Sequence, residues 1–431
     1  MIPNYSSESF VETFLPKKKS NQADKEVLEI ARKIIDDIRA NGDEALKKYV
    51  KKFDGGVPKR WEVTKEERLD AWNQVSNETI DSLKKAADNI RSFHSKQLQS
   101  SRFMDVNDEI ISGQLFRPIE RVGIYVPGGT ACYPSSVLMN AIPAVLAGVE
   151  EVIMVTPARN GESIAPILSV AADIAGVTTI YKIGGIQAIA SIAYGTETIP
   201  TVDKIVGPGN AYVAAAKSLV FGDVGIDMIA GPSEVAIIAD RSARPEYIAS
   251  DLIAQAEHDK NARAFLFSTS EALIKQTIVE VEKQCAILPR REIAESALKV
   301  KSAVVLVKDI DKAFELVNLL APEHLEIQLV DPLSYLGKVK NAGSVFLGNY
   351  TPEALGDYYA GPNHVLPTSG TARFSSGLSV DDFLKKTTFL YYSENALKQA
   401  SSHVVNIAME EQLAGHARAV QKRINKNDES S

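Results

Sequence analysis

The sequence predicts an α/β protein with two parallel-sheet units between a helical N-terminal segment and a helical C-terminal segment. Three observations support this prediction. Amphipathic segments fill the chain up to about residue 100, strands alternate with helices from about residue 120, and three of the first strands end in glycine-rich turns. Alternation of strands with helices is typical of parallel sheets whose helices cover both faces.

Length and composition indicate a globular protein with more than one domain. A chain of 431 residues is too long to fold around a single core. Its 45% hydrophobic content is sufficient for several cores. The net charge of -7 and the spread of Lys and Arg along the helices argue against a nucleic-acid partner. Neither a signal peptide nor a membrane-spanning apolar run is present, so we expect a cytoplasmic protein. We interpret Cys132 and Cys285 as core residues, since neither has a Cys-x-x-Cys partner.

The N-terminal segment is predicted to be helical, because apolar residues recur at helical spacing. The predicted helices are Ala23–Ala40, Asp43–Phe53, Lys65–Gln74 and Glu78–Gln99. His94 lies in the last of them, and we expect it to be a solvated residue on the helix face.

Glycine-rich turns mark the first sheet unit. The predicted strands are Arg121–Val126, Val152–Val155, Thr179–Ile183 and Lys204–Val206, and the turns begin after Val126, Ile183 and Val206. Ligands of open α/β sheets lie beyond the carboxyl ends of the strands, and a following helix N-terminus favours phosphate. No Gly-x-Gly-x-x-Gly occurs, so a nucleotide site and purely structural turns both stay open.

In the second sheet unit, one predicted helix ends in donor atoms. The predicted strands are Glu234–Ala239, Ala264–Ser268, Ala303–Val307 and Ser344–Leu347. The helix that begins near Pro245 ends with Gln255 and His258, which are three residues apart and therefore share one face. One metal ion could bind both, and an imidazole with an amide oxygen suits zinc. A histidine that only caps the helix is the alternative.

Three further segments carry polar groups suited to chemistry. Glu323 and His324 are adjacent and follow Pro322, so they could transfer protons at neutral pH if the backbone turns there. Asp357 and His364 lie in a glycine-punctuated loop. Ser233 follows a Gly-Pro turn and could hold a small polar ligand or only cap the turn. Residues 380–431 are predicted to return to helices, which carry Glu411 and His416 and could fold onto their own sheet or onto a neighbour's.

In order and spacing, these segments resemble the signature segments of the histidinol dehydrogenase family over roughly residues 25–425. The segments that carry the resemblance are Gln255-Ala-Glu-His258, Ala321-Pro-Glu-His324, Gly356-Asp357 with Asn363–Thr368, Glu411 to His416, Arg121–Gly129, Gly184–Ala190, Asp203–Ala211 and Ile229–Glu234.

The resemblance implies a fold and a domain division. It implies two incomplete Rossmann-like parallel-sheet domains with helical N-terminal and C-terminal segments. Residues 1–25 would be an N-terminal arm, residues 26–120 together with 234–375 an α/β domain with most zinc and catalytic residues, and residues 121–233 the NAD-binding domain. Residues 376–431 would be a C-terminal helical domain that packs on the partner subunit.

The resemblance also implies an activity. Members of the family oxidise L-histidinol through an aldehyde to L-histidine, with NAD and one Zn²⁺ per subunit, as homodimers with shared active sites. Gln255, His258, Asp357 and, from the other subunit, His416 would bind the zinc. His324 would be the general base and Glu323 would activate water.

The remaining implied roles are contacts to ligands. Ser233, His364 and Glu411, together with the zinc ligands and His324, would bind the substrate. Tyr125, Gln187 and Asn210 would contact NAD.

Three other interpretations stay open. A zinc hydrolase would also use a His/Asp/Gln site, but it has no need of the glycine-rich strand ends. A related zinc- and NAD-dependent alcohol dehydrogenase could act on another small amino or sulfonated alcohol. A protein that only binds a metal or a nucleotide would leave the adjacent Glu323 and His324 without a purpose.

Overall fold

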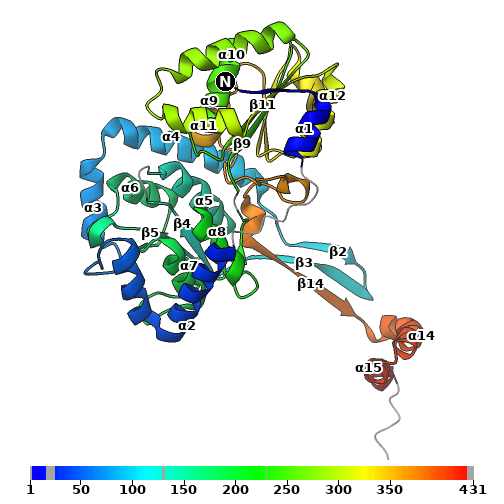
Figure 1. The fold of residues 1–431 in the computed structure, drawn as a ribbon. Helices are drawn as coiled ribbons and strands as arrows, with labels where there is room; N and C mark the ends of the chain where they lie inside the picture. The colour runs from blue at the N-terminus through cyan, green and yellow to red at the C-terminus, as the bar shows by residue number, and fades with distance from the viewer. Residues whose placement is uncertain (1, 16–24, 129–131, 230, 425–431) are drawn as a thin grey trace, which may run out of the picture. The chain divides into compact units, whose positions relative to one another are not determined.

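The computed structural model describes residues 2–15, 25–128, 132–229 and 231–424 (Figure 1). Contacts divide the chain into one unit of Met1–Gln97 with Glu120–Asp382 and a second unit of Leu98–Ile119 with Phe383–Ser431. The first unit contains two parallel sheets, here called sheet I and sheet II, and the second contains one antiparallel sheet, sheet III. The predicted α/β class, with parallel sheets between helical segments, is confirmed.

Sheet I is built from the described part of residues 121–226 and has the strand order β6-β5-β4-β7-β8. Its strands are β4 (Arg121–Tyr125), β5 (Glu151–Thr156), β6 (Thr179–Lys182), β7 (Lys204–Val206) and β8 (Gly225–Ile226). Helices α5 (Pro134–Ala147) and α6 (Pro166–Ala175) pack together, as do α7 (Gly185–Tyr194) and α8 (Ala211–Val220). β4 and β5 are almost continuously buried, as expected for strands that are covered on both faces.

The N-terminal helices complete the layers around sheet I. α2 (Lys25–Phe53) packs on α7 and α8, while α3 (Lys65–Gln74) and α4 (Asn77–His94) pack on α5 and α6. α2 is interrupted at Gly42, where φ is 48°, as predicted from the break between residues 40 and 43. The apolar face of α2 belongs to the core of sheet I. The grouping of residues 26–120 with residues 234–375 in one domain stays a prediction.

His94 is another correction. It is 0% exposed, and its Nδ1 lies 2.7 Å from Gln97 Oε1, so it is a buried residue and not a solvated one. The apolar face of α4 continues through it into the interior.

Sheet II has the strand order β1-β11-β10-β9-β12-β13 among the described residues, and all of its pairs are parallel. Its strands are β1 (Asn4–Tyr5), β9 (Glu234–Ala239), β10 (Arg263–Ser268), β11 (Ala303–Leu306), β12 (His324–Gln328) and β13 (Ser344–Leu347). One core contains residues of α9 (Pro245–Ala256), α10 (Glu271–Cys285) and α11 (Arg291–Val300). The core on the other face contains residues of α1 (Ser7–Phe14) and α12 (Ile310–Leu320).

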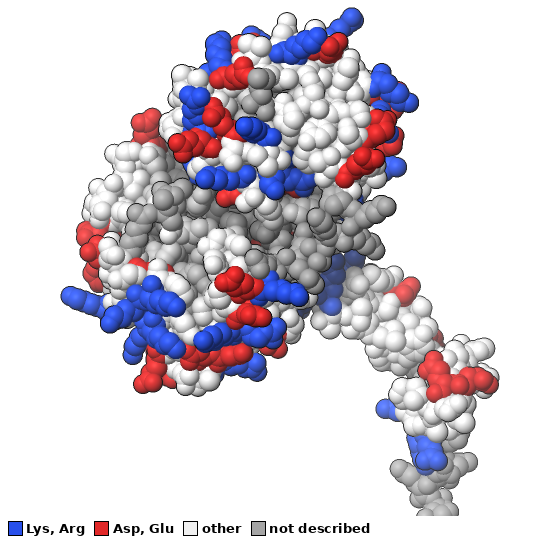
Figure 2. Space-filling model, viewed as in Figure 1, with Lys and Arg blue, Asp and Glu red and all other residues white. Residues whose placement is uncertain are grey.

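The first residues of the chain belong to sheet II. β1 pairs with β11, and α1 buries Phe10 and Phe14 in the core beneath α12. Cys285 is buried, as predicted, whereas Cys132 is exposed, which corrects its interpretation as a core residue. Figure 2 shows acidic and basic side chains intermixed on the visible face.

The second unit begins with strands that the sequence analysis did not predict. β2 (Arg102–Val106), β3 (Ile110–Pro118) and β14 (Leu384–Tyr392) form sheet III, and α14 (Glu394–Glu410) and α15 (Ala414–Ile424) follow. The prediction of helices from residue 380 onward is therefore wrong for β14, whose threonine and aromatic residues favour a strand. In the part of the chain that the structure describes, every helix is too short or too polar to cross a membrane.

Candidate active site

Glu323 and His324 lie at the amino edge of sheet II, where β12 begins. α12 ends at Leu320, and Ala321 follows with φ 52°, a left-handed conformation that reverses the chain. With this turn, the adjacent residues Glu323 and His324 can both act on one substrate. Both side chains are buried, with Glu323 7% and His324 4% exposed.

The hydrogen bonds of His324 define which ring nitrogen is basic. Nδ1 lies 3.1 Å from the carbonyl oxygen of Glu234, and a carbonyl only accepts, so the neutral ring carries its proton on Nδ1. In this neutral form Nε2 keeps its lone pair; the atom is buried and has no hydrogen-bond partner among the described residues. The nearest carboxylate oxygen to it is Asp357 Oδ1, at 3.6 Å. Nε2 is therefore the atom available to accept a proton.

Carboxylates surround the imidazole and change its protonation. Glu323 Oε2 and Glu353 Oε2 lie 3.8 Å and 3.6 Å from Nδ1. Burial alone opposes protonation of His324, but Glu323, Asp357 and Glu353 outweigh it and raise its pKa to about 10. Burial raises the pKa of Glu323 to about 7, although His324 opposes the shift. Glu323 is thus poised to exchange a proton near neutral pH.

Gln255, His258 and Asp357 come to the same edge of sheet II. Gln255 is in the last turn of α9 and only 1% exposed; with its amide nitrogen turned to Glu353 it donates to both carboxylate oxygens, at 2.7 and 2.9 Å. His258 follows the end of α9, is exposed, and interacts electrostatically with Asp357 and His324. Asp357 is on α13 (Glu353–Tyr358); burial opposes its ionisation, but His324 lowers its pKa.

These residues suit a cation by their chemistry. Gln255 Oε1 accepts a single hydrogen bond, from Glu234 N–H at 3.1 Å, and so keeps a lone pair. The carboxyl end of α9 also carries a partial negative charge. Among the described residues, His, Cys, Asp and Glu alone form no group of three that could hold a metal. A donor set from this unit would therefore have to include Gln255.

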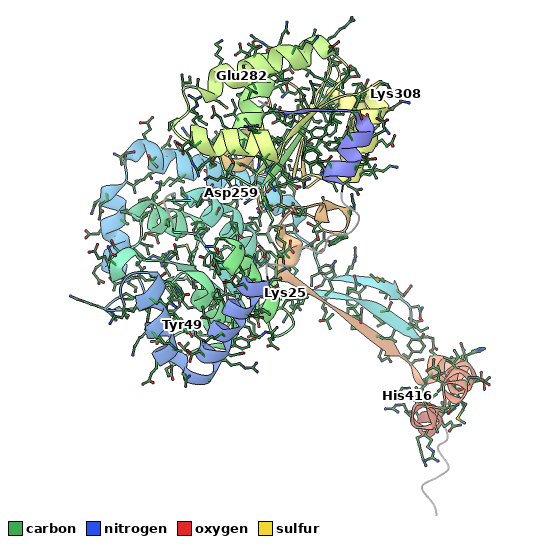
Figure 3. All side chains as sticks on the ribbon, in the orientation of Figure 1. Lys25, Tyr49, Asp259, Glu282, Lys308 and His416 are labelled. Carbon is green, nitrogen blue, oxygen red and sulfur yellow. The ribbon has the colours of Figure 1, made fainter. Side chains whose placement is uncertain are left out.

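The structure places the predicted substrate residues in two groups. His364 Nδ1 lies 2.9 Å from Asp357 O, its Nε2 lies 3.3 Å from Ser136 Oγ on α5, and Ser233 directly precedes β9. Glu411 and His416 belong to the second unit, where both are exposed; His416 is labelled on α15 in Figure 3.

Two neighbours of the site, Ser136 and Glu353, were missed by the sequence analysis. Glu353 is the first residue of α13 and follows a proline, so its sequence context is that of an ordinary solvated acid in a first helical turn. In the structure it is only 2% exposed. Nothing in its local sequence distinguishes it from a solvated residue.

A cavity of about 680 Å³ lies at the carboxyl edge of sheet I. Its lining includes Tyr125, Gln187 and Asn210, the three residues expected to contact NAD, together with Asp54 and Phe53 at the end of α2. Tyr125 Oη accepts a hydrogen bond from Gly185 N at 3.1 Å, and Asn210 caps α8 by accepting from the N–H groups of residues 212 and 213. The cavity thus adjoins two helix N-termini, which favour phosphate.

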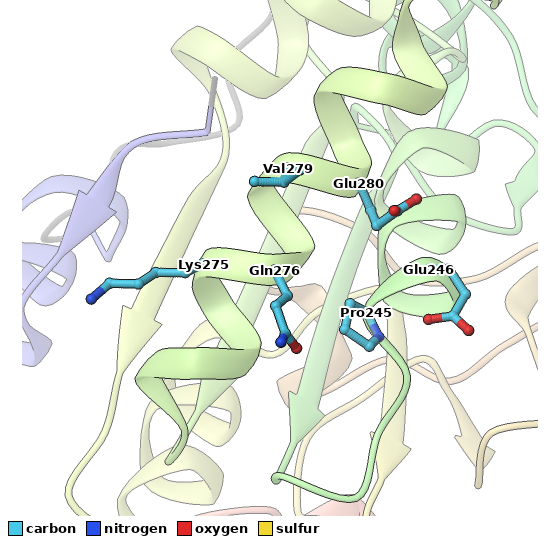
Figure 4. A pocket seen from close by; sticks show the side chains of 6 residues that line it. All are labelled: Pro245, Glu246, Lys275, Gln276, Val279 and Glu280. Carbon is cyan, nitrogen blue, oxygen red and sulfur yellow. The ribbon is translucent and has the colours of Figure 1, made fainter.

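A further hollow of about 380 Å³ lies between the beginning of α9 and α10 (Figure 4). Its lining contains none of the residues above; it consists of Pro245, Glu246, Lys275, Gln276, Val279 and Glu280.

Comparisons with known proteins agree with one another. A family model described as histidinol dehydrogenase matches residues 17–424. Histidinol dehydrogenases from Bacillus cereus and Clostridium acetobutylicum are each 52% identical; the first alignment covers 96% of both chains and the second 94% of both. A crystal structure of histidinol dehydrogenase from Elizabethkingia anophelis superimposes with a TM-score of 0.93 at 39% identity and covers 98% of each chain.

Proposed function

Because the chain belongs to the histidinol dehydrogenase family, we propose that it oxidises L-histidinol to L-histidine through L-histidinaldehyde, with NAD as hydride acceptor and one Zn²⁺ per subunit. These are the last two steps of histidine biosynthesis. The observation that carries the proposal is the buried pair Glu323 and His324, whose unpartnered Nε2 lies 3.6 Å from Asp357. A cytoplasmic location stays a prediction.

His324 is the general base of both oxidations. Its Nε2 accepts the proton of the alcohol while the carbinol carbon loses a hydride. After that proton has passed to solvent, the same nitrogen accepts a hydroxyl proton of the hydrated aldehyde in the second oxidation. With a pKa of about 10 the ring is protonated at neutral pH, so it needs part of the surrounding carboxylate charge to be offset. A cation held by Asp357 would supply that offset.

Glu323 activates the water for the second oxidation. Its carboxylate accepts a proton as the water oxygen adds to the aldehyde carbon, and the resulting hydrate is then oxidised. Glu323 Oε2 already accepts a hydrogen bond from Glu234 N–H at 2.9 Å, which orients the carboxylate. Its pKa of about 7 lets it give up and regain the proton within one cycle.

Gln255, His258, Asp357 and His416 of the partner subunit are the proposed zinc ligands. When bound, the ion would hold the nitrogens of the substrate and fix its carbinol carbon for hydride transfer. Ser233, His364 and Glu411 would complete the substrate site. For His364 the support is its position, since it is anchored to the backbone of Asp357.

Tyr125, Gln187 and Asn210 are the proposed NAD contacts. The support is that all three line the same 680 Å³ cavity, although they come from segments far apart in the chain. That volume suits a nucleotide-sized ligand.

We propose a homodimer because the second unit exposes a large apolar surface. Phe103, Val106, Leu390, Ile407 and Met409 are between 54% and 69% exposed. Exposed apolar residues in such numbers are typical of a surface that a partner covers.

Incubation with L-histidinol, NAD and Zn²⁺ tests the proposed activity. We expect two NADH for each histidine, because each oxidation transfers one hydride. Turnover of another small amino or sulfonated alcohol, with none of histidinol, would instead support a related zinc- and NAD-dependent alcohol dehydrogenase. A hydrolase would produce no NADH at all.

Mixed dimers test the shared site. Neither His416→Ala nor Gln255→Ala homodimers should turn over histidinol. Exchange between them should restore activity, because one site of each heterodimer receives intact ligands from both chains. Absence of recovery in isolated heterodimers would mean that each chain builds its own site.

A further inference from the structure

The backbone of Glu234 holds three residues of the proposed site. Its N–H donates to Glu323 Oε2 at 2.9 Å and lies 3.1 Å from the amide oxygen of Gln255. Its carbonyl accepts from His324 Nδ1 at 3.1 Å. The backbone of one residue thus orients the proposed water-activating carboxylate and one proposed metal donor, and it fixes the tautomer of the proposed base.

The hydrogen bonds of the Glu234 side chain are made to residues outside this site, although its carboxylate acts electrostatically on His324 and Glu323. It is fully buried, and its Oε1 accepts from Arg263 Nη1 at 2.7 Å, while its Oε2 accepts from Ser369 N at 3.2 Å. Arg263 is the neighbour of Glu234 in register, on β10, and its backbone N–H donates to Ser233 O at 3.0 Å. The ion pair therefore holds the first residue of β9 on its β10 side, whereas His324 lies on β12, at the other side of β9.

Arg263 is itself held at its other end. Nη2 donates to the carbonyl of Phe14, the last residue of α1, at 3.1 Å. The carboxyl end of a helix attracts a cation, and the guanidinium fork can hold two acceptors at fixed positions where an ammonium cannot. α1 thus anchors Arg263, which anchors Glu234.

We propose that Arg263 and Glu234 are positioning residues, which fix the β9 backbone that orients Glu323, His324 and Gln255. The inference rests on the proposed function, since it assigns no new reaction. Neither side chain takes part in proton transfer; their role is to keep the peptide groups of Glu234 from moving. Displacements of about 1 Å at a catalytic site can lower the rate by about 100-fold.

The test compares Glu234→Gln, Arg263→Lys, Arg263→Met and the double variant Glu234→Gln/Arg263→Met at saturating Zn²⁺. In Glu234→Gln the amide NH₂ would meet either the Ser369 N–H or the guanidinium, so one of the two contacts is lost. We expect kcat for histidinol and for histidinaldehyde to fall together by about 10- to 100-fold, with KM for NAD changed less than about three-fold. Arg263→Lys should retain more activity than Arg263→Met.

The double variant and a matched control separate positioning from loss of folding. If the two residues act as a pair, the double variant loses no more than the worse single variant. Arg244→Met removes an exposed ion pair between Arg244 and Glu246 at the beginning of α9 and should leave kcat unchanged. Figure 4 shows Glu246 at that position. Thermal unfolding shows which variants are folded. If Arg263→Met does not fold, Glu234→Gln and Arg263→Lys are sufficient to test the proposal.

Two outcomes would overturn the inference. One is unchanged kcat for both steps in folded Glu234→Gln and Arg263→Lys. The other is losses that add in the double variant. A wild-type protein that produces no NADH from histidinol would contradict the proposed function and not this pairing.

Discussion

Sheets I and II are both parallel, yet their candidate sites lie at opposite edges. The cavity of sheet I is at the carboxyl edge, where β4, β6 and β7 end and where α7 and α8 begin. The catalytic candidates of sheet II are at the amino edge, where β9 and β12 begin and where α9 and α12 end. In a parallel sheet these edges carry opposite helix ends.

The difference explains which ligand each edge can bind. Helix N-termini present unpaired N–H groups and partial positive charge, so the edge of sheet I suits a phosphate-bearing nucleotide. Helix C-termini present carbonyls and partial negative charge, and at sheet II they are joined by Glu323, Glu353 and Asp357. Such an edge suits a cation and stabilises a protonated imidazole.

The first prediction removes the base at the amino edge. His324→Asn keeps a polar side chain but has no basic nitrogen, so we expect both oxidations to slow by about 10²- to 10⁴-fold. NADH formation with each substrate measures the loss. Bound zinc should stay at the wild-type level, and retained turnover would contradict the assignment of Nε2 as the base.

The second prediction separates the two steps at that edge. Glu323→Gln cannot take a proton from water, so aldehyde oxidation should fall by about 10²-fold, and alcohol oxidation by less. Single-turnover measurements that start from the alcohol and from the aldehyde give the two rates. Equal losses would count against a water-activating role.

The third prediction tests whether the two edges act independently. Asp357→Asn should weaken zinc binding by about 10- to 100-fold, because it removes a charged ligand. NADH affinity, measured by fluorescence titration, should stay within about two-fold if no coupling free energy joins the sites. Gln187→Ala should weaken NADH binding and leave zinc affinity unchanged. Loss of both affinities in either variant would show that the edges form one coupled site.

Sequence reasoning succeeded where the information is local. Strands β4, β5, β6 and β7 of sheet I, the interruption of α2 at Gly42 and the turn before Glu323 all follow from short segments, whereas β8 was not predicted. The principle that ligands lie beyond carboxyl strand ends was applied to sheet I, and the cavity of sheet I lies at that edge. The candidate catalytic residues of sheet II lie at the amino edge, where this principle does not direct attention. The amino-edge cluster follows from the register of β9 with β12, which short segments do not contain.

The missed features depend on contacts between distant parts of the chain. β14 pairs with β3, so its identity as a strand depends on a partner far earlier in the sequence. His94 looks like a surface residue until α4 is placed against α5 and α6. Glu353 becomes a neighbour of the candidate catalytic residues only because α13 approaches His324 and Gln255. Burial of a polar residue is a tertiary property, and periodicity does not report it.

The smallest expected effect tests whether the carboxyl edge of sheet I owes its ligand to a helix N-terminus. Asn210→Ala removes the side-chain cap of α8 and should lower stability by about 1 kcal/mol. Ser270→Ala removes the equivalent cap of α10 in sheet II and should cost about as much. Only Asn210→Ala should also raise KM for NAD, by up to about ten-fold, since 1.4 kcal/mol corresponds to ten-fold in affinity. Thermal unfolding and NAD titration of the two variants give both quantities. Equal effects on KM would mean that Asn210 acts through general stability, and then the edge of sheet I would hold its nucleotide by the cavity walls and not by the end of α8.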